Sequence, residues 1–347
     1  MNQRPRPKTP KRPRRVTLAD VAKAAGVSVM TVSNVVNGHA SVGEKLRLRV
    51  NKQIERLGYQ PDLRARSFRL ARGWAIGMLV VSEGPDYLSN PWTSAVVAGL
   101  SHYLDEHNYG LYLSGCAAHE LGSKIRPFQN VDGLCVFLSG STPVRRNLLK
   151  KICDFGLPVV ALQETETPPS DGTIVRQDDR EGGRLIARHL RAKGVKRVTL
   201  IAPAEPWPGI NERVLGVREV FGRSSNALVR VVTCGAMRVD EVQRAIEADL
   251  KRHKLPDAYI ATSDQIAMPM MGVLTRHGIN IPKDVLVTGF NAFEFWRYST
   301  PVLTSVETPP LDIGRASGEL LLDRLAKGKF RVPLMTLPVK LVLGDSA

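Results

Sequence analysis

Seven short apolar runs alternate with longer helical patterns between residues 75 and 290. The runs are AIGMLVV (75–81), GLYLSG (110–115), GLCVFLS (133–139), PVVAL (158–162), RVTLIA (197–202), AYIAT (258–262) and VLVTGF (285–290). Such runs are typical of strands buried on both faces, and the helical patterns between them, such as 180–193 and 265–277, are typical of crossovers. The sequence therefore predicts an α/β body built on parallel sheets.

The positive charge of the chain is concentrated near its N-terminus. Residues 1–73 hold 17 Lys/Arg and 4 Asp/Glu, whereas the other 274 residues hold 32 basic and 29 acidic residues. A basic head on a nearly neutral body indicates a polyanion-binding domain joined to a domain with another task. A solubilising tail would explain residues 1–15, but not the basic residues that continue to Arg72. We expect residues 1–15 to be a disordered arm, which either touches phosphates or has no role.

Composition excludes several other classes of protein. With 43% hydrophobic and 24% charged residues, the chain has the profile of a soluble globular protein. No apolar stretch reaches the roughly 18 residues of a membrane span, and no apolar segment follows the basic N-terminus as in a signal peptide. We therefore expect a cytoplasmic protein without a membrane partner. Its scattered cysteines are expected to be reduced thiols rather than disulfides or zinc ligands: Cys116, Cys135, Cys153 and Cys234.

Residues 16–60 carry the signals of three short helices. Thr17 and Asp20 fit a capping box, Gly26 ends the first helix, and Ser28 caps the second. The predicted helices span residues 18–25, 29–36 and about 44–57. Two short helices joined by a tight turn, with a third helix as support, form the helix-turn-helix layout.

The second helix of this layout enters the major groove of DNA, where its first residues reach the base edges. Its exposed positions carry short hydrogen-bonding side chains, which suit phosphates and bases better than the long charged side chains of a purely structural bundle. We therefore predict binding to double-stranded DNA. The candidate contact residues of the head are Thr17, Ser28, Val29, Met30, Thr31, Ser33, Asn34 and Asn37.

The run VTLADVAKAAGVSVMTVSNVVNG, continued by RLGYQPDLRARSF, closely resembles the N-terminal segment of the lactose-repressor (LacI/GalR-type) family of bacterial transcription regulators. The rest of the chain resembles the family's effector-binding body more loosely, over its full length. The resemblance implies a sequence-specific DNA-binding repressor controlled by a sugar or nucleoside-like effector. It implies neither catalytic activity nor a cofactor.

Residues 61–74 look like the hinge of that family. A helix there would have about two turns, too few to be stable alone, so it should form only against a partner hinge and DNA. The resemblance places Ala65, Arg66 and Phe68 at the minor groove. The family has a leucine wedge at the position of Phe68, and phenylalanine is also a known wedge residue. The alternative is that Phe68 packs on the body.

For residues 75–347 the resemblance implies two similar α/β subdomains joined by three crossovers, with a ligand cleft between them. We expect one subdomain at about 75–194 with 309–328, and the other at 195–308 with 329–347. The segment between Gly115 and Val131 is shorter than is usual in the family, so a helix there should be missing or truncated. No heptad tail follows, and paired hinges need two chains, which predicts a homodimer on a near-palindromic operator.

The same resemblance suggests five effector-binding residues in the cleft: Trp92 (in a wall formed by residues 89–92), Asp178, Arg213, Asp264 and Asn291. Trp207 is a sixth candidate, because it stands in the loop before Arg213, where the family usually has smaller residues. Each has a structural alternative, such as a helix N-terminal charge for Asp178, a surface ion pair for Arg213 and a helix cap for Asp264. Asn291 replaces a family aspartate, and its amide both accepts and donates. The aromatic side chains around it either line the cleft or form core or dimer contacts. If Trp92 and Trp207 face each other, the effector presents a flat or apolar face.

Enzymatic signatures are absent from the sequence. There is no GxxxxGK[ST] loop, no GxSxG and no HExxH, and no histidine pairs at metal-ligand spacing. Two other functions stay open as hypotheses. One is a sugar or nucleoside enzyme with an added nucleic-acid-binding head. The other is an architectural DNA protein, which would not need a large neutral body.

Overall fold

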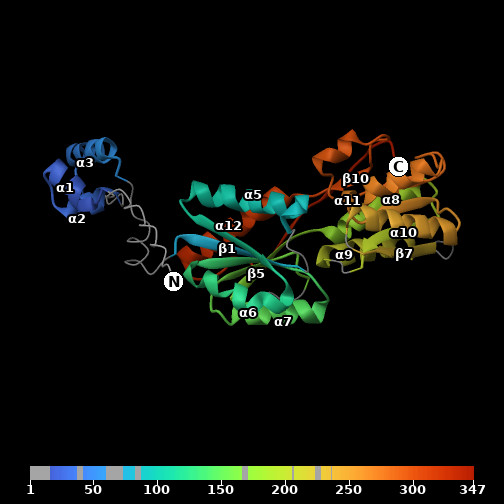
Figure 1. The fold of residues 1–347 in the computed structure, drawn as a ribbon, viewed down its shortest axis with the longest axis horizontal. Helices are drawn as coiled ribbons and strands as arrows, with labels where there is room; N and C mark the ends of the chain where they lie inside the picture. Colours follow the sequence, from blue (N-terminus) through green and yellow to red (C-terminus); the bar gives the residue numbers. More distant parts are fainter. Residues whose placement is uncertain are drawn as a thin grey trace, which may run out of the picture. The chain divides into compact units, whose positions relative to one another are not determined.

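The computed structural model describes residues 16–36, 42–59, 73–82, 87–165, 171–204, 207–222, 228–235 and 237–347. The chain divides into two compact units, residues 1–72 and 73–347, which we call the head and the body (Figure 1). In the part of the chain that the structure describes, no helix is both long and apolar enough to cross a membrane.

The head contains three helices, α1 (Leu18–Ala25), α2 (Val29–Val36) and α3 (Glu44–Leu57). The predicted capping box starts α1, since Asp20 N donates to Thr17 Oγ1 at 3.3 Å and Thr17 N donates to Asp20 Oδ2 at 2.8 Å. The three helices share a small apolar core of Val21, Ala22, Ala25, Val32, Val35, Val50 and Tyr59. The predicted helix-turn-helix arrangement is confirmed.

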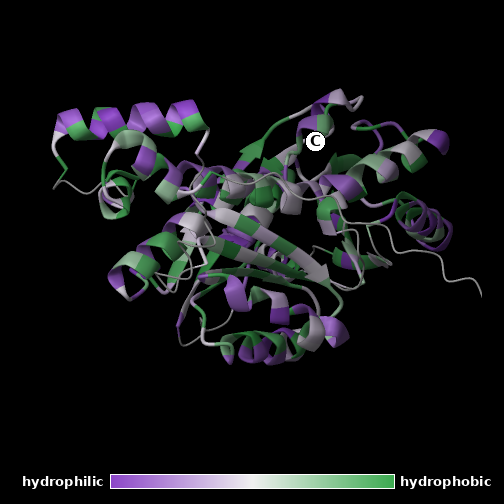
Figure 2. Ribbon diagram, turned by 60° about the vertical axis from the view of Figure 1, so that its left-hand side comes forward, coloured by the Kyte–Doolittle hydropathy of each residue, from purple (hydrophilic) through white to green (hydrophobic). Residues whose placement is uncertain are grey.

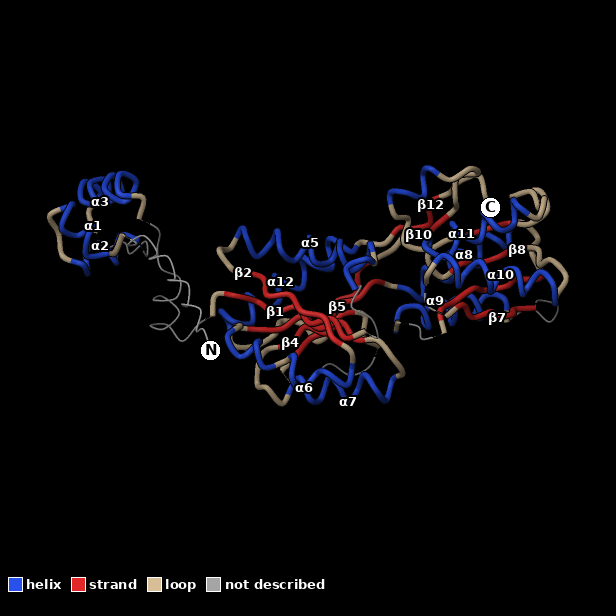
Figure 3. Tube along the Cα trace, in the orientation of Figure 1, coloured by secondary structure: helices blue, strands red, loops and turns tan. Residues whose placement is uncertain are grey.

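The first subdomain of the body is built on six parallel strands in the order β11-β5-β4-β3-β1-β2 (Figure 3). The strands are β1 (Ala75–Val81), β2 (Gly110–Cys116), β3 (Gly133–Leu138), β4 (Val159–Leu162), β5 (Gly172–Gln177) and β11 (Leu334–Leu337). Helices α5 (Pro91–Glu106) and α12 (Pro310–Lys327) cover one face. The short α6 (Leu121–Lys124) and α7 (Thr142–Cys153) cover the other.

The second subdomain is built on four parallel strands in the order β7-β6-β8-β9. The strands are β6 (Arg197–Pro203), β7 (Leu228–Cys234), β8 (Ala258–Ala261) and β9 (Leu286–Thr288). Helices α8 (Asp179–Ala192) and α9 (Pro208–Phe221) pack on one face, and α10 (Val239–Arg252) and α11 (Asp264–Arg276) on the other. The predicted α/β fold with parallel sheets is confirmed. In Figure 2 hydrophobic and hydrophilic residues lie on different sides of the helices, as this layering requires.

The boundaries between the two subdomains differ from those expected. Helix α8 belongs to the second subdomain, not the first, because its apolar face of Ile186, Ala187 and Leu190 packs with α9 and β6. Strand β11 belongs to the first subdomain, because it pairs with β5. The chain returns to the second subdomain with β12 (Lys340–Val342), which pairs antiparallel with β10 (Ser305–Glu307), and the residues that follow also pack there, as Ala347 does.

The segment between β2 and β3 contains only short helical turns, as expected from its length. Helix α6 has four residues and is followed by a 3-10 turn at Arg126–Asn130. The ring of Phe128 in this turn is fully buried and meets Tyr112 of β2 edge-to-face, with ring centroids 4.8 Å apart. Together with the buried side chains of Leu121, Ile125 and Val131, Phe128 thus covers the sheet where a longer helix would otherwise lie.

Candidate nucleic-acid interface and ligand pocket

Helix α2 presents two apolar side chains to solvent at its first turn. Val29 is 47% exposed and Met30 is 70% exposed, although both begin a helix whose Val32 and Val35 are buried. The turn is fixed by Ser28, whose Oγ accepts a hydrogen bond from Thr31 N at 3.1 Å. Exposed apolar groups on a rigid helix start can contact thymine methyl groups in the major groove.

Other candidate DNA contacts lie on the same helix or at the helix starts. Asn34 and Ser33 are half-buried on α2, while Thr17 and Ser28 are exposed at the starts of α1 and α2. The hydroxyls of Thr17 and Ser28 are used in helix caps, so we expect these residues to position the backbone rather than to read bases. The candidates Asn37, Ala65, Arg66 and Phe68 lie outside the described residues, as do the arm 1–15 and most of the hinge.

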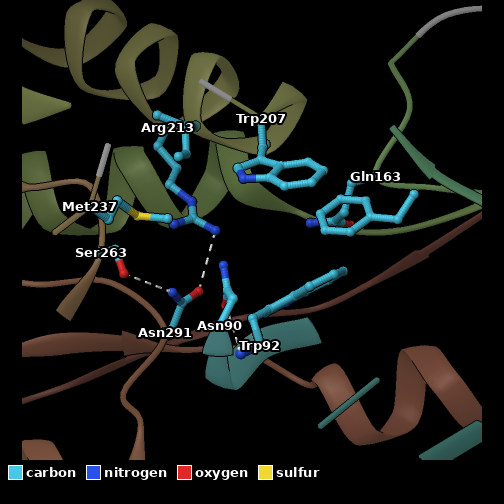
Figure 4. Close-up of a pocket in the computed structure, with 11 residues that line it drawn as sticks. Asn90, Trp92, Gln163, Trp207, Arg213, Met237, Ser263 and Asn291 are labelled. Atoms are coloured by element: carbon cyan, nitrogen blue, oxygen red, sulfur yellow. Dashed lines mark hydrogen bonds between the residues drawn. The ribbon is translucent and has the colours of Figure 1, made fainter. Parts of the chain in front are cut away.

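A pocket of about 40 Å³ lies in the body where the carboxyl ends of strands from both subdomains meet (Figure 4). Parallel α/β sheets commonly bind ligands at this position. The residues that line the pocket come from strand ends, loops and helices of both subdomains: Asn90, Trp92, Phe137, Gln163, Trp207, Gly209, Ile210, Arg213, Met237, Ser263 and Asn291.

Aromatic rings form one wall of the pocket. The ring of Phe137, on β3, stacks on Trp207, with centroids 4.0 Å apart and planes at 15°. The ring of Trp92, at the start of α5, also contacts Phe137, with centroids 4.8 Å apart and planes tilted by 43°. Because Phe137 belongs to the first subdomain and Trp207 to the second, this stack spans the cleft.

Arg213, on α9, is buried, and all three of its nitrogens have partners. Nε donates to Asp179 Oδ1 at 2.8 Å, Nη1 donates to the Thr262 carbonyl oxygen at 2.5 Å, and Nη2 donates to Asn291 Oδ1 at 3.3 Å. The guanidinium also lies 3.8 Å from the centroid of the Phe290 ring. The charge of Arg213 is therefore neutralised within the protein.

The carboxylate of Asp179 links the two walls of the pocket. Besides Arg213, it accepts hydrogen bonds from Gln163 Nε2 at 2.9 Å and from Gln177 Nε2 at 2.8 Å. Gln177 Oε1 in turn accepts from Trp92 Nε1 at 3.0 Å. Asp179 and Arg213 belong to the second subdomain and the other three residues to the first, so one network of hydrogen bonds connects both.

The loop that carries Asn291 is held by Asp264. The Asp264 carboxylate accepts from Phe293 N at 2.9 Å and from Ser305 Oγ at 2.7 Å. This support matters because Asn291 and Ala292 have positive φ angles of 98° and 49°, which residues with a side chain rarely adopt. Burial raises the pKa of the Asp264 carboxyl to about 7, although its hydrogen bonds act in the opposite direction.

The structure brings four of the six candidate effector-binding residues to the pocket: Trp92, Trp207, Arg213 and Asn291. Asp178 is not among the lining residues, because its Oδ1 caps α8 by accepting from Glu181 N at 2.9 Å. Asp264 is not either, since it is fully buried beneath the loop that it holds. Of the nearby aromatic residues, Trp296 packs in the core of the second subdomain.

The stretch 89–92, which the resemblance places in one wall of the cleft, contributes Asn90 as well as Trp92, and Asn90 caps α5 by accepting from Trp92 N at 2.9 Å. Sequence reasoning missed Phe137, Gln163 and Met237 at the pocket, and Asp179 behind it. Phe137 had no signal in the sequence, since an apolar residue in a buried strand is normally part of the core. In the part of the chain that the structure describes, no group of His, Cys, Asp and Glu could hold a metal ion.

Two family descriptions match this chain. Residues 17–62 match "Bacterial regulatory proteins, lacI family", and residues 187–347 match "Periplasmic binding protein-like domain". Over residues 17–62 the chain is therefore similar to LacI-family regulators of bacterial transcription. It is also similar to the HTH-type transcriptional repressor PurR of Vibrio atlanticus (strain LGP32), at 29% identity over 89% of this chain and 92% of the relative.

Solved structures agree with the fold over most of the chain. A transcriptional regulator CelR–cellobiose complex is 26% identical, with a TM-score of 0.69, and covers 96% of this chain and 100% of that one. The Lac repressor bound to ONPG in the repressed state is 24% identical, with a TM-score of 0.82, and also covers 96% of this chain and 100% of that one. The second likeness concerns the fold alone.

Proposed function

We propose that this chain is a LacI-family DNA-binding repressor whose DNA affinity is controlled by a small neutral ligand in the body. The observation that carries ligand control is the position of the pocket. Its aromatic stack and its hydrogen-bond network both span the two subdomains. A ligand that enters must rearrange contacts on both sides of the cleft. Its binding free energy can therefore change the relative orientation of the two subdomains.

The ligand class follows from the charge of the pocket. Of the described residues that line it, Arg213 alone carries a charge, and that charge is balanced by Asp179. A carboxylate or phosphate ligand would find no uncompensated cation there. The other lining groups are aromatic rings and the amides or hydroxyl of Asn90, Gln163, Asn291 and Ser263. They suit a neutral ring that stacks on one face and exchanges hydrogen bonds at its edge.

DNA recognition is assigned to α2, with Val29, Met30 and Asn34 reading bases. The hinge and its Phe68 wedge are carried into this proposal from the family resemblance. We propose a homodimer on a near-palindromic operator, since two hinges must meet for either to be ordered. As a DNA-binding regulator it would act in the cytoplasm.

We propose no catalytic activity for the pocket. The acidic side chains near the pocket already accept hydrogen bonds within the protein. Asp179 accepts from Arg213, and Asp264 accepts from the backbone of the loop that carries Asn291. Ser263 caps α11, where its Oγ accepts from Gln265 N at 3.3 Å. None of these groups has the arrangement of a nucleophile beside a base.

The test is a thermal-shift screen of neutral sugars and nucleosides, followed by DNA-binding assays with each hit. The variant Trp207→Ala removes the aromatic stack before α9, and Leu215→Ala removes an exposed side chain from α9 itself. We expect Trp207→Ala to lose the ligand-dependent rise in melting temperature and Leu215→Ala to keep it, while both bind DNA. Equal responses in both variants would place the ligand elsewhere.

A further inference from the structure

The segments at the amino ends of β6, β8 and β9 carry an excess of positive charge. They are residues 191–197 (RAKGVKR), 251–257 (KRHKLPD) and 276–285 (RHGINIPKDV), and we call the surface that they form the basic face. These segments hold nine Lys/Arg and two Asp/Glu, whereas the rest of the chain after residue 73 holds 23 Lys/Arg and 27 Asp/Glu. The near neutrality of the body therefore hides one strongly positive surface on an otherwise negative domain.

Hydrogen bonds hold the three segments side by side. Asp257 N donates to the Arg197 carbonyl oxygen at 2.9 Å, and Leu286 N donates to the Asp257 carbonyl oxygen at 3.0 Å. The Asp257 carboxylate also accepts from Lys196 N at 2.9 Å and from Arg197 Nη2 at 2.7 Å. Because β6, β8 and β9 are parallel neighbours, their amino ends lie at one edge of the sheet, and the pocket lies at the carboxyl ends. The basic face is therefore separate from the pocket.

The middle segment is fixed to the sheet by a buried carboxylate. Asp249, on α10, is 4% exposed and accepts from Tyr259 OH of β8 at 2.8 Å and from Arg230 Nη2 of β7 at 2.9 Å. The same carboxylate lies 3.0 Å from Nδ1 of His253, in the middle of the run 251–254. The cations of this run therefore project from a rigid base, so that little backbone entropy is lost when a partner binds them.

Most cations of the basic face have no acidic partner within the described residues. Arg197 pairs with Asp257, and Arg276 lies 4.0 Å from Glu247. The other cations are exposed and form no ion pair in that part of the chain: Arg191, Lys193, Lys196, Lys251, Arg252, Lys254 and Lys283.

Helix stabilisation accounts for only some of these cations. A cation in the last turn of a helix interacts favourably with the helix dipole, which accounts for Arg191, Lys251 and Arg276. It does not account for Lys196 or Lys283, because both follow the end of the preceding helix by several residues. The face holds more positive charge than its helices need.

The side chains of the basic face suit phosphate groups better than a protein partner. None of the large apolar side chains in these described segments is exposed: Val195 and Val285 are buried, and Leu255, Ile279 and Ile281 are half-buried. Interfaces between proteins usually have an apolar or aromatic centre and are poor in lysine. Lysines and arginines on a polar surface are typical of contacts to the DNA backbone, which carry no sequence information.

We infer that the basic face binds the phosphate backbone of a DNA duplex without sequence preference, as a second DNA-contacting surface of this chain. The inference goes beyond the proposed function, which assigns DNA recognition to α2 and needs no DNA contact by the body. A chain that binds its operator through the head would hold a second stretch of duplex through the body.

The experiment loads the full chain with an operator duplex obtained by binding selection, at the stoichiometric ratio, and then titrates a second duplex of unrelated sequence. The two duplexes carry different fluorophores, so that a retained operator signal shows that the head stays occupied. Fluorescence anisotropy of the second duplex gives its affinity at several salt concentrations.

Two fourfold variants with the same change in net charge are compared. One neutralises the basic face with Lys193→Gln, Lys196→Gln, Lys251→Gln and Lys254→Gln. The matched control neutralises four exposed lysines of the first subdomain, with Lys124→Gln, Lys150→Gln, Lys151→Gln and Lys329→Gln. Melting temperatures identify any variant that fails to fold.

We expect the loaded wild-type chain to bind the second duplex with an affinity that falls steeply as salt rises. The basic-face variant should bind it at least about tenfold more weakly at low salt, with a log–log salt slope that is smaller by about 3, since each phosphate contact contributes about 0.9. The control variant should keep the wild-type affinity and slope, and both variants should bind the operator as the wild type does.

Two results would overturn the inference. The loaded wild-type chain would bind no second duplex, or both variants would weaken its binding equally, as a mere effect of net charge. Polyglutamate is titrated in parallel, and its binding to the basic face in place of the duplex would assign the face to an acidic protein instead. Because operator binding by the head is followed separately, these results leave the proposed function intact.

Discussion

Asn34 is the residue of the head whose chemistry is most specific for DNA. Its amide can make two hydrogen bonds to adenine N6 and N7, whereas Val29 and Met30 can only make apolar contacts. We expect Asn34→Ala to cost about 1–3 kcal/mol of binding free energy at the preferred operator and to relax the preference at one position in each half-site. Binding selection from random duplexes measures both effects. Equal weakening on every sequence would make Asn34 a phosphate contact instead.

Asp264 is a buried acid whose titration should be visible in stability. Its pKa rises to about 7 in the folded protein, above its ordinary value of 3.8, because burial disfavours the carboxylate. The folded state therefore holds a proton that the unfolded state has lost between about pH 4 and pH 7. In this interval the contribution of Asp264 to stability falls as pH rises, by at most about 1.4 kcal/mol per pH unit.

Asp264→Asn should remove this pH dependence. Urea unfolding at pH 5, 6, 7 and 8 should show the wild-type chain losing stability relative to the variant as pH increases. Ser305→Ala is the matched control, because it removes a hydrogen bond to the same carboxyl but keeps the titrating group. Parallel curves for wild type and Asp264→Asn would show that Asp264 does not titrate in this range.

At the residue scale the sequence predicted the pocket only in part, and the two acidic misses have physical reasons. Asp178 and Asp179 are adjacent, so at the start of a helix one caps the backbone and the other points inward. The sequence does not indicate which of the two caps the helix and which faces the pocket. Asp264 was assigned to the pocket by resemblance, but it acts one layer below, on the loop of Asn291. Buried partners of this kind depend on tertiary contacts that spacing does not reveal.

At the scale of elements, α5 and α12 pack closely because glycines leave room for the facing backbone. A Cβ at Gly314 of α12 would overlap the Val96 carbonyl oxygen of α5. We expect Gly314→Ala to lower the free energy of unfolding by about 1–3 kcal/mol.

Gly272→Ala in α11 is the matched control, since the nearest neighbour of the added Cβ would be Arg276 Nη1 at 3.8 Å. There the better helix propensity of alanine should stabilise by about 0.5–1 kcal/mol. Thermal melts that rank the two variants the other way would contradict this account of the packing.

The sequence predicted most elements but assigned some to the wrong subdomain. All seven apolar runs became strands, because burial on both faces leaves a clear pattern. Strands β5, β7, β10, β11 and β12 were missed, and in β5 and β7 the reason is that Arg176 and Arg230 interrupt their apolar character. Helix α8 and strand β11 were assigned to the wrong subdomain. The chain passes three times between the subdomains, and no feature of the sequence indicates the residue at which each passage occurs.

At the scale of the whole molecule, the account requires the body to control the head. In this account the two subdomains of the body adopt two relative orientations, and a ligand binds one orientation more tightly than the other. The ratio of these two ligand affinities limits how far the ligand can change the affinity for DNA. The same factor must then apply to ligand affinity when DNA is bound. Neither effect needs contact between the ligand and the DNA.

The most direct test measures the affinity of the full chain for its selected operator duplex, at one fixed salt concentration, as a ligand from the thermal-shift screen is titrated. Salt must be fixed because phosphate contacts make DNA affinity depend steeply on it. The account predicts a change of about 5- to 150-fold in operator affinity, with the same factor for ligand affinity when the duplex is present. A ligand that saturates the body and leaves operator affinity unchanged would contradict it.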